Sequence, residues 1–81
     1  MKNKQNTQKT EIQILAYASK QQGMIFSESD VNTFDSAKSA LKKLQNSGEV
    51  INLGVITGSE VSTLYKMTSA GIIALVKSLR D

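Results

Sequence analysis

Apolar residues recur at helical spacing in three segments of this 81-residue chain, and shorter segments between them have the β-branched character of strands. The first helical segment has apolar residues at i, i+3 and i+4: Ile12, Leu15, Ala16. Thr10 and Gln13 have the spacing of a capping box, and Gly23 is a residue type that ends helices. This pattern predicts a helix over residues 10–22.

A brief strand and a short helix are predicted next. Residues 24–26 are apolar but too few for more than a short strand. Ser27 stands three residues before Asp30, which is typical of a helix that starts with a serine cap and acidic residues at the positive end of its dipole. This helix can extend only to about Thr33 or Phe34, because Asp35 is positioned as the N-cap of the following helix.

The helix that begins at Asp35 has a narrow apolar stripe and ends at Gly48. The stripe occupies positions i, i+3, i+4 and i+7: Ala37, Ala40, Leu41, Leu44. We expect these four side chains to be buried, with the small alanines allowing a close approach to neighbouring elements. A short helix followed directly by this one has the outline of a helix-turn-helix.

After Gly48 the pattern changes to that of a β-hairpin. "EVINLG" and "VSTLYKM" are rich in β-branched and aromatic residues, and a loop containing glycine separates them. Thr68 then caps a last helix, whose apolar stripe is expected to close the core: Ile72, Leu75, Val76, Leu79. The order of elements predicts one α+β domain over residues 10–81, preceded by a disordered, basic tail over residues 1–9.

Composition excludes several classes of function. The chain has no Cys and no His, so we expect no disulfide, no metal site and no other cofactor. A serine nucleophile would lack its common activator and no phosphate-binding glycine motif occurs, so we do not expect an enzyme. No apolar run approaches the ~20 residues that span a bilayer, and the expected location is the cytoplasm. The net charge of +3 is a mild bias toward anionic partners.

The predicted order of helix, helix-turn-helix, hairpin and helix resembles that of winged-helix domains. The third helix and the strand after it are similar to a habitual pattern of that superfamily: Ala40-Leu41, Leu44, Gly48, Val50-Ile51. "TLYKMTSAG" resembles the segment that leads into the last helix of many small regulators, and "FSESDV" is similar to the start of the N-terminal winged helices of AbiEi-type antitoxins. The resemblance implies a winged helix-turn-helix fold with a three-helix core, a two-stranded wing and a C-terminal helix. It also implies DNA binding of the kind found in phage and plasmid regulators.

The outer face of the third helix carries the main candidates for DNA contact. It is polar and has no acidic residue: Ser36, Lys38, Ser39, Lys42, Lys43, Asn46. Lysines at i and i+4 cost some helix stability, and a purely structural helix has no reason to accept that cost. In a major groove, Ser39 and Lys42 would reach base edges while the other lysines meet phosphates. The alternative interpretation is an ordinary solvated face.

Three further polar residues are candidates of a second rank: Thr57, Ser59, Lys66. Thr57 and Ser59 lie at the hairpin tip, which lacks the arginine common in wings and is also typical of any turn. Lys66 would add a phosphate contact if it faced the same way as the third helix. The basic tail would follow the DNA backbone or be no more than a disordered end.

We also expect a homodimer, because small regulators of this kind bind two half-sites. The expected seam joins the first and last helices through outward apolar residues: Ile14, Tyr17, Ile73, Val76. The sequence thus predicts selective binding of double-stranded DNA, in a transcriptional regulator or origin-recognition protein of a mobile genetic element. The competing hypothesis is a winged-helix module that binds a host or phage protein through the hairpin or the last helix, without DNA.

Overall fold

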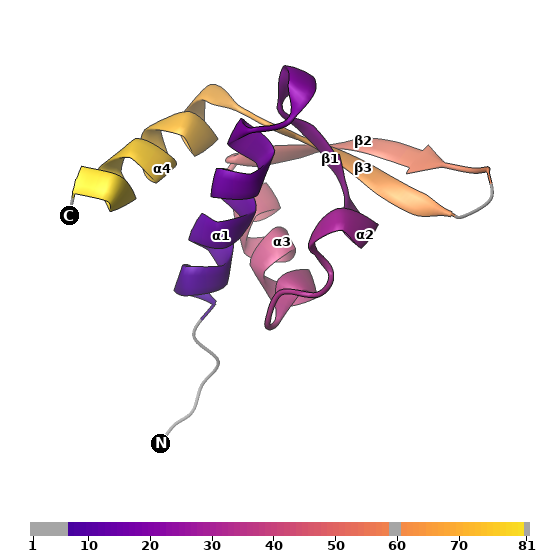
Figure 1. Cartoon of the computed structure of the whole chain (residues 1–81), viewed down its shortest axis with the longest axis horizontal. Helices are drawn as coiled ribbons and strands as arrows, with labels where there is room; N and C mark the ends of the chain where they lie inside the picture. The colour runs from indigo at the N-terminus through magenta and orange to yellow at the C-terminus, as the bar shows by residue number, and fades with distance from the viewer. Residues whose placement is uncertain (1–6, 59–60, 81) are drawn as a thin grey trace.

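The computed structural model describes residues 7–58 and 61–80, which form four α-helices, one 3-10 turn and a three-stranded antiparallel sheet (Figure 1). The fold is therefore α+β. The elements in chain order are α1 (Gln8–Ser19), the 3-10 turn η1 (Gln22–Met24), β1 (Ile25–Ser27), α2 (Glu28–Val31), α3 (Ala37–Asn46), β2 (Val50–Ile56), β3 (Ser62–Met67) and α4 (Ser69–Arg80). Within the described residues, no helix has the length and apolar character needed to cross a membrane.

The sheet has the order β1-β3-β2, so β3 lies in the middle and β2 forms one edge. β2 and β3 make the predicted hairpin, and the predicted short strand is present one residue later than expected, as β1. Lys66 on β3 is paired with Ile25 on one side and with Ile51 on the other. A bulge at Leu53 shifts the β2–β3 register between Asn52 and Gly54.

The core lies between the helices and one face of the sheet. Figure 1 shows α1 and α3 side by side on that face, with the β2–β3 hairpin extending beyond them. Because side chains alternate along a strand, Tyr65 and Met67 face this core while Lys66 faces away. Phe26 stacks on Tyr65, with ring centroids 5.6 Å apart, and fixes β1 against the centre of the sheet.

The start of α1 differs from the expectation. The helix begins at Gln8, with Thr7 as its N-cap, so residues 7–9 belong to the domain; the rest of the predicted tail lies outside the described residues. The predicted capping box of Thr10 and Gln13 is wrong. Thr10 is buried and its hydroxyl instead donates to the Asp35 carbonyl oxygen at 2.7 Å.

The end of α1 also differs. The helix stops at Ser19 rather than at residue 22, because backbone N–H groups after it bond three residues back and close a tighter turn. Gly23 lies inside η1 with φ of 68°, a conformation that glycine adopts without strain. It therefore shapes the turn into β1 rather than ending the helix itself.

The junction between α2 and α3 is partly as predicted. The Ser27–Asp30 capping box is present, with the Ser27 N–H donating to the Asp30 carboxylate at 3.0 Å. The helix is shorter than predicted and ends at Val31. Asp35 is not the N-cap of α3: that position is Ser36, in the left-handed conformation with φ of 54°, and Asp35 lies one residue earlier, where its carbonyl oxygen accepts the Thr10 hydroxyl.

The end of α3 confirms the glycine stop. Gly48 has φ of 78°, its N–H bonds the Gln45 carbonyl oxygen, and the Glu49 N–H bonds that of Leu44. This pair of bonds is a Schellman motif, which satisfies the last carbonyl groups of the helix. The chain consequently turns directly from α3 into β2.

The last helix confirms its predicted cap but not its predicted buried stripe. The Thr68 hydroxyl accepts a hydrogen bond from the Gly71 N–H, but of the four stripe residues only Leu75 is buried. The other three remain exposed: Ile72, Val76, Leu79. The reason is that α4 turns small residues toward α1 and β3, above all Gly71, where an added Cβ would lie 2.5 Å from the Glu49 carbonyl oxygen.

Candidate nucleic-acid interface

The two faces of α3 differ sharply in chemistry. The predicted apolar stripe is confirmed: its four residues, Ala37, Ala40, Leu41, Leu44, are all buried. The residues on the opposite side of the helix are all exposed: Lys38, Ser39, Lys42, Lys43, Asn46. The helix thus presents one continuous polar surface, which we call the α3 outer face and define by these five residues.

The α3 outer face is positively charged. Its three lysines have no acidic neighbour on the helix, since the nearest acids in sequence are Asp35 before it and Glu49 after it. Within the described part of the chain, the amino groups of Lys38, Lys42 and Lys43 make no hydrogen bond or ion pair. Three cations on about two turns of helix therefore keep their full charge available for an anionic partner.

The core fixes the orientation of α3. Leu41 and Leu44 are almost fully buried and pack in the same cluster as Tyr65. Burial and the nearby Glu28 carboxylate raise the pKa of the Tyr65 phenol, while a hydrogen bond from the Gln45 side chain lowers it. Tyr65 is thus a neutral phenol in the folded protein and links α3 to the middle strand.

Ser36 lies at the start of α3 rather than on its outer face. Its backbone is left-handed and its residue is half-buried, because it forms the corner between the α2–α3 turn and the helix. Its carbonyl oxygen accepts the Ala40 N–H at 3.0 Å. Ser36 therefore serves the helix start, and a hydroxyl at a helix N-terminus also lies where phosphate groups commonly bind.

Lys66 does not face the same way as α3. It lies on β3 between two core residues, so its side chain leaves the opposite face of the sheet, beside Ile25 and Ile51. Thr57 is exposed just after β2, remote in sequence from α3, and Ser59 lies outside the described residues. Among the described residues, neither Thr57 nor Lys66 makes a hydrogen bond or ion pair with the α3 outer face.

The predicted dimer seam is partly wrong. Ile14 is 0% exposed and belongs to the core cluster, because α1 is packed on both α3 and α4 and has little outward apolar surface. Tyr17 is half-buried and meets Phe26 edge-on, with ring centroids 6.4 Å apart. Ile73 and Val76 do point outward on α4.

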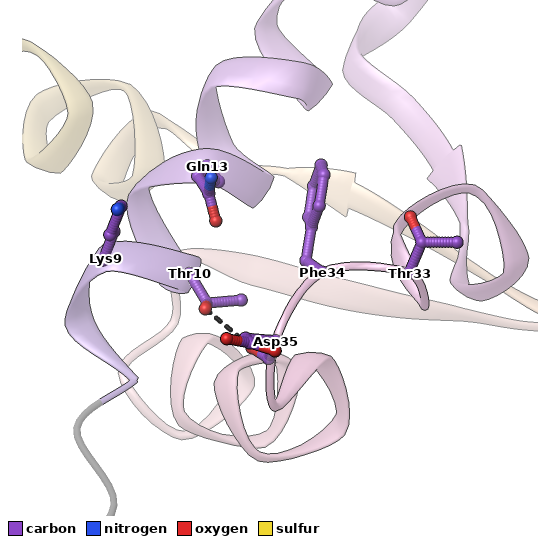
Figure 2. Close-up of a pocket in the computed structure, with 6 residues that line it drawn as sticks. All are labelled: Lys9, Thr10, Gln13, Thr33, Phe34 and Asp35. Atoms are coloured by element: carbon purple, nitrogen blue, oxygen red, sulfur yellow. Dashed lines mark hydrogen bonds between the residues drawn. The ribbon is translucent and has the colours of Figure 1, made fainter.

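A polar pocket of about 380 Å³ lies between α1 and the α2–α3 turn and was not predicted. Figure 2 shows Lys9, Thr10 and Gln13 on α1 and Thr33, Phe34 and Asp35 on the α2–α3 turn, with the Thr10–Asp35 hydrogen bond joining the two segments. Sequence reasoning missed it because Lys9 was assigned to the tail. The pocket mixes a lysine with a carboxylate and offers no nucleophile–base pair.

Comparisons of the chain with family models, with curated proteins and with solved structures find no match. Nor do the described residues bring three metal-ligating side chains together. The α3 outer face is therefore the strongest candidate site on the grounds of its own geometry and charge.

Proposed function

We propose that the chain is a winged-helix domain that binds double-stranded DNA by placing the α3 outer face in the major groove. The order of elements supports this fold: α1, α2 and α3 form the helical part, the β2–β3 hairpin takes the position of a wing, and α4 follows. The third strand, β1, pairs with β3 at the base of the hairpin. An α-helix fits the width of the major groove of B-form DNA.

The single observation that carries the proposal is the unpaired positive charge of α3. A helix that only closes a core gains nothing from three lysines without acidic partners, and pairs such as Lys38 and Lys42 repel each other slightly. Phosphates of a duplex would remove that repulsion. Binding to phosphates releases condensed counterions, which makes such affinity strongly dependent on salt.

Within this proposal, the residues of the outer face divide into two roles. Lys38 and Lys43 meet phosphates and set the position of the helix. Ser39, Lys42 and Asn46 provide hydrogen-bonding groups for base edges, which is how a sequence preference arises. A bound domain would block a promoter or mark an origin by occupying it, as expected for a regulator of a mobile element.

A mobility-shift assay on duplex fragments tests the proposal. The variant carries alanine at three lysines of the outer face: Lys38→Ala, Lys42→Ala, Lys43→Ala. A matched control loses the same charge at exposed lysines elsewhere: Lys20→Ala, Lys66→Ala, Lys77→Ala. We expect the wild type and the control to shift the DNA at low salt and the variant to lose the shift. No shift by the wild type, or equal loss in variant and control, would reject the role of α3.

A further inference from the structure

The edge of the sheet formed by β2 is unusual for a protein of this size. β2 has seven residues, Val50–Ile56, and among the described strands it pairs only with β3, so the peptide groups along its other side meet no strand. No charged residue occurs from Val50 to Gly58. An exposed edge of this kind is a template for pairing with another strand.

Proteins usually protect such edges by shortness, charged side chains or proline. The opposite edge follows this rule, because β1 has only three residues. β2 has neither a charge nor a proline, and of the known devices it shows only the bulge at Leu53. The β1 and β2 edges of the sheet thus differ in their protection against strand pairing, which indicates that another strand pairs with the β2 edge.

The side chains of β2 point to the same conclusion. A strand with one face on a core normally alternates apolar and polar residues, yet here large apolar side chains are exposed along most of the strand: Ile51, Leu53, Val55, Ile56. The hairpin extends past α1 and α3 in Figure 1, and α2 meets it on the β3 strand, where the Ser29 N–H donates to the Ser62 hydroxyl at 3.4 Å. Exposed apolar residues gathered on one element mark an interaction surface rather than ordinary surface.

We propose that the β2 edge pairs antiparallel with the β2 edge of a second copy of this chain. The edge has no charge with which to select a charged peptide, so its best partner is an uncharged, β-branched strand, and β2 itself has that composition. Two domains of net charge +3 would meet along a segment where neither carries a charge. The lysines of α3 lie on a different element, and all three are exposed in the single chain.

The symmetry of this arrangement favours a closed dimer. Antiparallel pairing of identical edges around a two-fold axis uses the same surface on both copies and leaves no further β2 edge for growth. Chains of about 80 residues have small cores, and pairing with a second copy is a common supplement to their stability. The hairpin, which carries no basic residue before Lys66, then serves self-association rather than DNA contact.

Measurement of the molecular mass in solution by light scattering tests this inference without DNA, so its failure and that of the proposed function are distinguishable. Val55→Lys places a charge on the β2 edge, and Ile73→Lys is a matched control on α4, since the two residues are 62% and 60% exposed. We expect the wild type and Ile73→Lys to have twice the 8.8 kDa mass of the chain, and Val55→Lys to have the single mass.

Circular dichroism of all three proteins checks that each is folded. Val55 and Ile73 are both highly exposed, so we expect both variants to fold. The proposal would be overturned by a monomeric wild type or by open-ended assemblies of the wild type. It would also be overturned by a dimer that only Ile73→Lys dissociates. Loss of the dimer in Ile73→Lys alone would instead assign the interface to α4.

Discussion

Substitution of Gly71 by alanine should destabilise the domain, although alanine is the better helix former. Replacing glycine in a helix contributes up to about 1 kcal/mol of stability from propensity. In the structure, however, the new Cβ would lie 2.5 Å from the Glu49 carbonyl oxygen, 2.6 Å from the Met67 Cγ and 3.2 Å from the Leu15 Cδ2. The first contact is with backbone, which cannot move without shifting the turn between α3 and β2.

Overpacking of this kind costs about 1–3 kcal/mol, and with close contacts to the α3–β2 turn, β3 and α1 we expect the upper half of that range. The net loss should be about 1–2 kcal/mol, which lowers the Tm of a domain of this size by roughly 5–15 °C. Thermal unfolding followed by circular dichroism measures it. Ala70→Gly, at an exposed position of the same helix, measures propensity alone. A Tm of Gly71→Ala equal to or above that of the wild type would refute the account of how α4 packs.

Two further predictions concern the groups that hold α1, α3 and the sheet together. Thr10→Val removes the donor to the Asp35 carbonyl oxygen and should lower the unfolding free energy by about 1–2 kcal/mol. The control Ser19→Ala removes an exposed hydrogen bond and should change the unfolding free energy by less than about 0.5 kcal/mol. Equal effects of the two substitutions would contradict the assigned role of Thr10. The pKa of the Tyr65 phenol is raised by burial, so the stability from its neutral form is complete below the ordinary value of 10.0 and is lost as the pH rises through the higher folded value. Tyr65→Phe should therefore reduce the fall in Tm as the pH rises above the ordinary tyrosine pKa of 10.0. An unchanged fall in Tm would contradict this role of the Tyr65 phenol.

Helix periodicity was sufficient to predict α3 because its buried stripe is complete and its ends carry unambiguous signals. Leu41 and Leu44 could only be buried, and Gly48 could only end the helix in the left-handed conformation. The exposed lysines follow from the same periodicity, since they occupy the opposite side. The main candidate site was therefore predictable from local pattern alone.

Tertiary contacts decided what local pattern left undetermined. Thr10 has the spacing of a cap, yet its hydroxyl binds a carbonyl 25 residues away, and α3 is capped by Ser36 rather than by Asp35. Neither the hydrogen bond of Thr10 nor the identity of the α3 cap can be predicted from the sequence next to these residues. The exact ends of α1 and the identity of the α3 cap were for that reason predicted wrongly.

The orientation of α4 was missed for a related reason. Its apolar stripe is regular, but the contact with α1 and β3 is so close that only small residues fit, and Gly71 decides which side faces inward. A hydrophobicity pattern ranks glycine as neutral and cannot detect this preference. Ile14 was assigned to the surface by the same kind of argument, although α1 is covered by two helices.

The salt dependence of duplex binding tests the central claim most directly. Fluorescence anisotropy of a labelled duplex, titrated between about 50 and 200 mM salt, gives the slope of the logarithm of the binding constant against the logarithm of the salt concentration. Each phosphate contact contributes about −0.9 to that slope. Because Lys38 and Lys43 are the two lysines assigned to phosphates, the triple variant Lys38→Ala, Lys42→Ala, Lys43→Ala should have a slope shallower by about 2. If the triple variant keeps the wild-type slope, or the wild type does not bind at the lowest salt, α3 is not a DNA-binding helix.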